Sequence, residues 1–152
     1  MSSTDEKRAP LVGLYGSVST PWRAPLIEAL ERAGVACFDP VTREWQGIND
    51  GNGDEMQPRI DALVAREFNA LREVTCVVFH LDGASDSLAS RMEFGWLLAA
   101  KVPTFFAIDA RVKGRNHIFA AAKLYEHMHR SESADEALQR ALAWMRESAK
   151  SQ

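Results

Sequence analysis

The chain has 152 residues, enough for one domain with a single core, and its 46% hydrophobic and 26% charged content is that of a globular protein. Its 18 basic and 21 acidic residues give a formal net charge of −3, which argues against nucleic acid or an anionic membrane as a partner. The first ten residues do not have the pattern of a signal peptide, and the longest apolar stretch, residues 94–108, is too short and interrupted to cross a bilayer. We therefore expect a cytoplasmic protein.

The chain begins with a polar tail over residues 1–10, which we expect to be frayed. An apolar run over residues 11–15 predicts a buried strand that ends in a tight loop. Ser19 or Thr20 can cap the helix that follows, and Gly34 is placed to end it.

A second strand is expected over residues 35–40, followed by a loop that is rich in turn formers over residues 47–53. The length of this connection favours a lid or a binding loop. Helical spacing of apolar residues predicts a helix over residues 58–73. Residues 75–81 are almost continuously apolar, which indicates a strand buried on both faces.

The next helix is expected to begin at Ser87 or Ser90 and to end at Lys101. After it come a strand over residues 102–108, a short helix over 116–123, a weak strand over 125–130 and a capped helix over 133–148. The pattern contains no internal repeat, so residues 11–149 are expected to form one domain.

Strands that alternate with helices predict an α/β fold with right-handed βαβ units. Five strands favour a single flavodoxin-like or Rossmann-like three-layer sandwich, with a parallel sheet in the order 2-1-3-4-5. In such a sheet the ligand binds at the carboxyl ends of the strands, near the switch point between strands 1 and 3. That rule selects the loops over residues 16–20, 39–54, 82–90 and 109–116.

The loop over residues 15–19 places small residues and backbone N–H groups before a helix N-terminus, which can accept a phosphate or a sugar oxygen. It matches neither a G-x-G-x-x-G fingerprint nor a P-loop. The alternative is a plain turn from strand to helix with a serine cap.

Glu93 is the sharpest candidate for chemistry. It is expected near the start of a helix at the carboxyl edge of the sheet, where a carboxylate can attack an anomeric carbon and form a covalent glycosyl-enzyme. Ser90 and Glu93 also have the spacing of a capping box, which the local sequence by itself favours. Gly95 shifts the balance, because a glycine inside a helix costs about 1 kcal/mol relative to alanine and suggests close approach of a backbone or a ligand.

Six short elements follow one another along the chain. They are Tyr15-Gly16-Ser17, Asp39-Pro40, Glu67, the strand Cys76 to Leu81, Met92-Glu93-Phe94-Gly95 and Lys101-Val102-Pro103. In this order and spacing, over about residues 11–145, the chain resembles the nucleoside 2-deoxyribosyltransferase-like superfamily, which includes nucleotide N-glycosidases.

The resemblance implies that Glu93 is the nucleophile, that Glu67 is the acidic residue of the preceding helix, and that Tyr15-Gly16-Ser17 faces the sugar. It also implies that Asn116 reaches the site of a neighbouring subunit. The chain departs from the family pattern at three places. Ser87 stands where classical members carry an aspartate, with Asp86 beside it, and Glu44-Trp45 replaces a glutamine that contacts the base. We also do not expect the C-terminal extension with which classical members reach into the next subunit.

The leading interpretation is therefore an N-glycosyl transferase or hydrolase acting on a (deoxy)nucleoside or nucleoside monophosphate. Glu93 would attack C1′, Asp86 or Asp82 would handle the proton on the base, and Tyr15 and Glu67 would position the sugar and the nucleophile. The substrate-binding candidates are Gly16, Ser17, Ser19, Asp39, Trp45, Ser87, Ser90 and Asn116. This chemistry requires no metal and no cofactor.

Two other classes of function remain open: a sensor module that binds a nucleotide or an ADP-ribose-type ligand without turnover, and an oligomeric scaffold with a degenerate site. The base, the sugar and the choice between transferase and hydrolase are also open. His80 is interpreted as a structural histidine rather than a catalytic base.

We further expect a homo-oligomer, with a dimer as the simplest case. The expected helix from Ser90 to Lys101 is apolar on more than one face and needs cover on a second side. The alternative is cover within one chain, by the loop over residues 47–53 and the last helix.

Overall fold

The computed structural model describes residues 8–18, 21–41, 53–84 and 88–151. In these residues, five strands form one parallel sheet in the order β2-β1-β3-β4-β5. The strands are β1 (Leu11–Gly16), β2 (Ala36–Phe38), β3 (Cys76–Leu81), β4 (Thr104–Ile108) and β5 (Met128–Arg130). This confirms the predicted α/β class and strand order.

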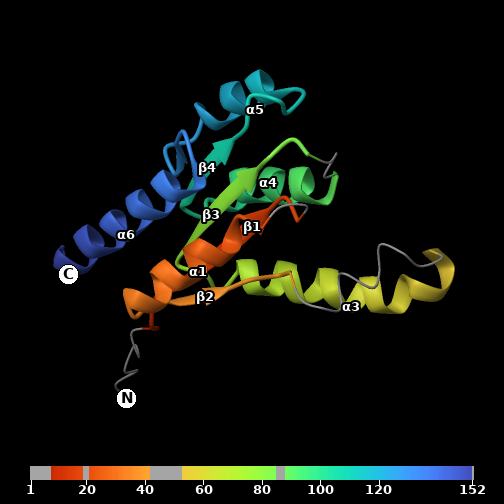
Figure 1. Ribbon diagram of the computed structural model, residues 1–152, viewed down its shortest axis with the longest axis horizontal. Coiled ribbons are helices and arrows are strands. Elements are labelled where there is room, and N and C mark those ends of the chain that lie inside the picture. Colours follow the sequence, from red (N-terminus) through yellow and green to blue (C-terminus); the bar gives the residue numbers. More distant parts are fainter. Residues whose placement is uncertain (1–7, 19–20, 42–52, 85–87, 152) are drawn as a thin grey trace, which may run out of the picture.

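Helices cover both faces of the sheet and complete the three-layer sandwich (Figure 1). They are α1 (Arg23–Arg32), α3 (Gly53–Leu71), α4 (Leu88–Ala100), α5 (Arg115–Ala122) and α6 (Ala134–Lys150). One core cluster contains apolar residues of α3, α4 and α5, and a second contains those of α1 and α6. The last helix therefore packs on the face of the sheet opposite to α3 and α4.

The position of β3 at the centre of the sheet explains why its sequence is apolar without alternation. Val77 and Phe79 belong to the core cluster on one face, and Cys76 and Val78 belong to the cluster on the other. All four side chains are fully buried. A strand covered by helices on both faces has no polar side, as the sequence predicted.

The first helix begins later than expected. Its N-cap is Trp22, which caps α1 without a side-chain hydrogen bond, and Arg23 is its first helical residue. Ser19 and Thr20, the expected caps, lie outside the described residues.

Helix α3 begins at Gly53, five residues before the expected start at Pro58. Proline lacks an N–H and removes one hydrogen bond from a helix. A long helix tolerates that loss here, and Asp54 and Glu55 in its first turn interact favourably with the helix dipole. In Figure 1, α3 extends beyond the sheet.

The first half of helix α4 differs from the sequence prediction at Ser90 and at Gly95. It begins at Leu88, so Ser90 is the third helical residue and not the cap. Gly95 is exposed, and a Cβ added there would meet no atom within 4 Å in the described structure. No other described part of the chain therefore approaches Gly95 closely, and the approach of a ligand there stays a prediction.

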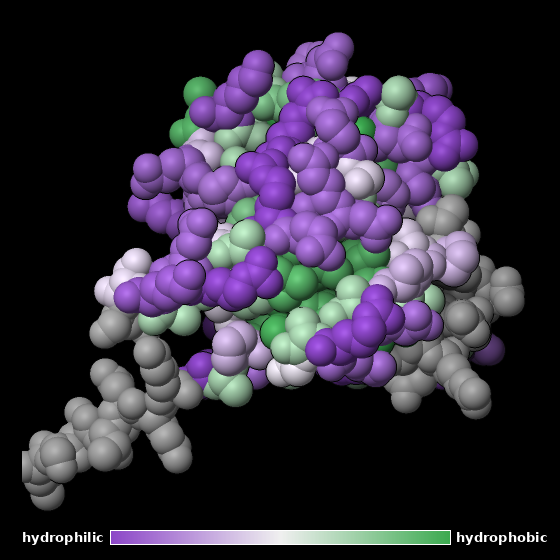
Figure 2. Space-filling view, turned by 60° about the vertical axis from the view of Figure 1, so that its left-hand side comes forward, coloured by the Kyte–Doolittle hydropathy of each residue, from purple (hydrophilic) through white to green (hydrophobic). Residues whose placement is uncertain are grey.

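Most of the surface shown in Figure 2 is hydrophilic, and its largest group of hydrophobic residues lies near the centre of the view. No helix in the described ranges is both long and apolar enough to cross a membrane.

Candidate functional site

Two carboxyl groups meet between neighbouring helices, Glu67 from α3 and Glu93 from α4. The helices pack through an edge-to-face contact between Phe68 and Trp96, with ring centroids 6.1 Å apart. Glu67 and Glu93 are each only 7% exposed, and their side chains are hydrogen-bonded to each other. Because ionised carboxylates only accept hydrogen bonds, this contact requires one of the two groups to carry a proton.

The environment of the pair favours the protonated form of Glu93. Burial, followed by the charge and the hydrogen bond of Glu67, raises the pKa of Glu93 to about 8. The positive charge of Arg23 acts in the opposite direction. The two carboxyls therefore share a proton at neutral pH, an arrangement that suits groups that exchange protons during a reaction.

Tyr15, in β1, contacts the backbone of Glu67 from within the protein core. Its side chain is fully buried, and its hydroxyl donates a hydrogen bond of 2.8 Å to the backbone carbonyl of Glu67. Burial, followed by the charges of Glu93 and Glu67, raises the pKa of Tyr15 well above its usual range, so it remains a neutral donor. Its contact in this structure is with α3, and a contact with a sugar stays a prediction.

The end of β1 lies so close to the end of β3 that a side chain does not fit between them at Gly16. Gly16 has φ +126°, and a Cβ there would lie 2.0 Å from the carbonyl oxygen of His80. Ser17 N donates to the same oxygen at 2.8 Å, and Ser17 Oγ accepts from Asp82 N at 3.0 Å. Glycine is required here by both the backbone conformation and the contact with β3.

Asp82 follows β3 and is 4% exposed. Its Oδ1 accepts a hydrogen bond of 2.8 Å from Ala84 N, and its backbone carbonyl accepts one of 2.9 Å from Arg111. The charge of Asp82 acts on Arg23, as do the charges of Glu67 and Glu93. Asp82 therefore belongs to the same electrostatic cluster. Ser90, in α4, is also buried.

Arg23 is the site residue that sequence reasoning missed. It is 6% exposed, and it forms an ion pair of 3.3 Å with Asp39, which was expected among the substrate ligands. Asp39 also accepts a hydrogen bond of 2.9 Å from Val41 N. An arginine at a helix start usually indicates a solvated residue, so no local pattern distinguished this one.

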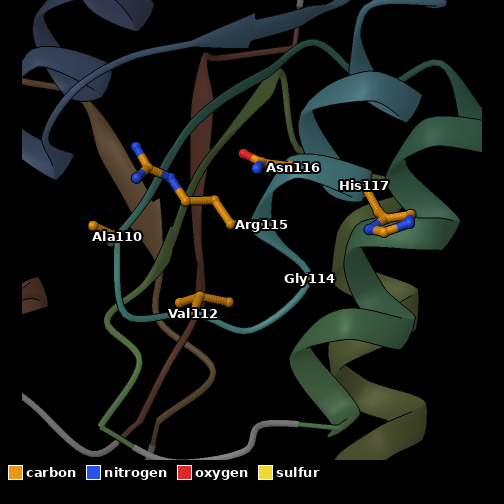
Figure 3. Close-up of a pocket in the computed structure, with 6 residues that line it drawn as sticks. All are labelled: Ala110, Val112, Gly114, Arg115, Asn116 and His117. Atoms are coloured by element: carbon orange, nitrogen blue, oxygen red, sulfur yellow. The ribbon is translucent and has the colours of Figure 1, made fainter.

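Asn116 lies at the start of α5. It lines a pocket of about 390 Å³ with Ala110, Val112, Gly114, Arg115 and His117 (Figure 3). In Figure 3 the side chains of Arg115 and Asn116 extend to one side of the helix and that of His117 to the other. Asn116 is exposed. A role for it in the site of a second subunit stays a prediction.

Four of the predicted site residues, Ser19, Trp45, Asp86 and Ser87, lie outside the described residues. Within the described ranges, no three His, Cys, Asp or Glu side chains are grouped to hold a metal ion.

His80 lies on the sheet face opposite to the pair. Its Nδ1 is 3.2 Å from the carbonyl oxygen of Ala107, and its ring meets that of Trp22 edge-on at 5.3 Å. A carbonyl only accepts, so Nδ1 is the donor. Burial lowers the pKa of His80. These contacts agree with a structural histidine.

The arrangement can be compared with known families. A family model described as nucleoside 2-deoxyribosyltransferase like matches residues 10–110, which contain Glu67, Glu93 and the loop after β1. No curated protein matches the chain. Because the matched segment spans most of the chain and carries the whole carboxyl cluster, the protein belongs to the nucleoside 2-deoxyribosyltransferase-like family.

Proposed function

We propose that the protein cleaves or transfers at the N-glycosidic bond of a (deoxy)nucleoside or nucleoside monophosphate, with Glu93 as nucleophile. One observation carries this proposal: the buried, hydrogen-bonded pair of Glu67 and Glu93 in a chain of this family. A carboxylate held out of water beside a proton-bearing partner suits covalent glycosyl transfer.

In the proposed first step, a carboxylate oxygen of Glu93 forms a bond to C1′ while the C1′–N bond breaks. The electron pair of the broken bond goes to the base nitrogen, and Asp82 or Asp86, which enters this step in its protonated form, supplies the proton that the leaving base takes up. In the second step, water or a second base attacks C1′ and gives its proton to the now ionised Asp82 or Asp86, while the bond between C1′ and Glu93 breaks and releases Glu93 as carboxylate. A water nucleophile gives hydrolysis, and a base gives transfer.

The neighbours of Glu93 have separate roles in this scheme. Glu67 takes the proton from Glu93, so that Glu93 can react as an anion while the pair keeps its single proton. Tyr15 holds the backbone of α3 at Glu67 through its 2.8 Å hydrogen bond. The loop at Gly16 and Ser17 provides the surface on which a sugar would rest.

The test is incubation of the protein with a panel of deoxynucleosides, ribonucleosides and their 5′-monophosphates. Chromatographic detection of free base supports the proposal, and addition of a second base distinguishes transfer from hydrolysis. No base release from any member of the panel contradicts it.

A sensor module without turnover is the second candidate, and one observation favours it. A pKa of about 8 leaves Glu93 mainly protonated at neutral pH, whereas a nucleophile must be ionised. Calorimetric binding of a nucleotide or of ADP-ribose without base release supports this candidate.

We also propose that the protein is a homo-oligomer. Leu88 and Met92 on α4 are 72% and 63% exposed, although both are large hydrophobic residues. Of the two segments expected as possible cover within one chain, helix α6 packs on the other face of the sheet, and residues 47–52 of the loop lie outside the described residues. A second copy of the chain is then the proposed cover for α4.

A further inference from the structure

Arg23 combines two unfavourable placements. It is the first residue of α1, where the helix dipole disfavours positive charge, and it is 6% exposed, so its guanidinium has lost most of its water. A buried charge persists only where partners compensate for the lost hydration. Its contacts therefore indicate what it does.

The guanidinium holds the end of β1 and the loop that follows it. Arg23 donates to the backbone carbonyls of Leu14 at 3.1 Å, Gly16 at 3.1 Å and Ser17 at 2.6 Å. Its Nε also lies 3.3 Å from Asp39 Oδ1, at the end of β2. One planar cation thus connects the ends of β1 and β2. We call its three hydrogen bonds to the backbone carbonyls the fan, and a lysine could not reproduce them.

The same group is the positive centre of the carboxyl cluster. The charges of Asp39, Glu93, Glu67 and Asp82 all act on it, from the end of β2, α4, α3 and the end of β3. In return, Arg23 lowers the pKa of Glu93 against the effects of burial and Glu67. Tyr15, which also contacts the cluster, is neutral and adds no charge.

We propose that Arg23 is a positioning residue that performs two tasks at this site. Its fan of hydrogen bonds fixes the loop from Leu14 to Ser17 on which the sugar would rest, and its buried guanidinium, paired with Asp39, supplies the positive charge of the carboxyl cluster. Arg23 acts through these groups and does not itself contact the substrate. The first task rests on the proposed function, whereas the second concerns the protein alone.

Two substitutions separate the tasks. Arg23→Lys keeps the charge and loses the fan, whereas Arg23→Gln loses the charge and keeps two amide donors. Arg32→Gln is the matched control, since Arg32 lies at the other end of α1 with a side chain that is 73% exposed. Circular dichroism and thermal unfolding establish that each variant is folded.

The charge is tested without any substrate, by NMR titration of the Glu93 carboxyl in protein carrying ¹³C-labelled glutamate, with Glu93→Gln to assign the signal. Arg23→Gln is expected to move the midpoint to higher pH, and Arg23→Lys and Arg32→Gln are expected to leave it near the wild-type value. An unchanged midpoint in Arg23→Gln overturns the role of the charge. The NMR titration tests the role of the charge even if the wild-type protein releases no base.

The loop is tested by kinetics of base release. Arg23→Lys is expected to raise KM about tenfold, because charge-assisted hydrogen bonds to the loop are lost, while the pH profile keeps its position. A wild-type KM in Arg23→Lys overturns the role of the fan. If neither variant folds, Arg23 is a purely structural residue and the proposal is wrong.

Discussion

The carboxyl groups of Glu67 on α3 and Glu93 on α4 are hydrogen-bonded to each other, although each residue is only 7% exposed. One proton must lie between them, since two carboxylates cannot donate to each other. Both the reactivity of the site and the pH dependence of folding stability follow from where that proton goes.

Replacement of the nucleophile gives the first prediction. Glu93→Ala is expected to reduce base release by about 1,000-fold or more, because the covalent step is lost. The variant is expected to stay folded. Glu126→Gln is the control, since Glu126 is exposed and remote from the pair. Unchanged turnover in Glu93→Ala, measured by chromatography, contradicts the proposed role.

Replacement of the partner changes the pH profile. The charge and the hydrogen bond of Glu67 both raise the pKa of Glu93, so Glu67→Gln is expected to lower it. The rate of base release, which requires ionised Glu93, should then reach half its maximum at lower pH than in the wild type. Glu73→Gln, an exposed residue just after α3, serves as the control and should leave the profile in place.

Stability should depend on pH in a direction set by the raised pKa of Glu93. Between about 4.5 and about 8 the folded state holds a proton that the unfolded state has released, so stability falls as pH rises through this window. The slope is at most about 1.4 kcal/mol per pH unit.

Glu93→Gln mimics the protonated carboxyl and should lack this loss. Its free energy of unfolding relative to the wild type is therefore expected to increase from pH 5 to pH 8, as measured by urea denaturation. A difference that stays constant over this range would show that Glu93 does not carry the proton.

The contact between Gly16 and β3 predicts an unusually costly alanine substitution. A Cβ at Gly16 would overlap the backbone carbonyl of His80 at 2.0 Å, and backbone cannot move aside as a side chain can. Gly16→Ala is expected to lower the free energy of unfolding by about 3 kcal/mol or more.

Gly34→Ala is the matched comparison. Gly34 also has positive φ, +67°, but a Cβ there meets nothing within 4 Å. Only the backbone strain remains, which costs about 1 kcal/mol. Equal losses in the two variants would contradict the proposed importance of the contact with His80.

The exposed apolar residues of α4 predict how the proteins assemble. Met92→Glu places a charge on the surface proposed for a second copy, and it is expected to shift the protein toward monomer in analytical ultracentrifugation at micromolar concentration. Leu124→Glu is the control, because Leu124 is 79% exposed near the opposite end of the sheet and belongs to no proposed interface. A wild-type protein that sediments as a 16.9 kDa monomer would contradict the interface itself.

The sequence predicted the features that depend on residues close together along the chain. The apolar run of β3 and the alternation of strands with helices predicted the class of fold, and strand connectivity then predicted the order of the sheet. The position of Gly16 at the end of β1 predicted a special loop at the switch point.

Only the tertiary structure decided what the charged residues do. Ser90 and Glu93 have the spacing of a cap, yet α4 begins earlier and turns Glu93 toward Glu67, 26 positions back in the chain. Arg23 has the local sequence of a surface residue, yet it is buried against carbonyls of β1 and the carboxylate of Asp39. Strands and helices are specified by patterns over a few residues, whereas the burial of a charge and its pKa depend on which distant segments the fold brings within a few ångströms.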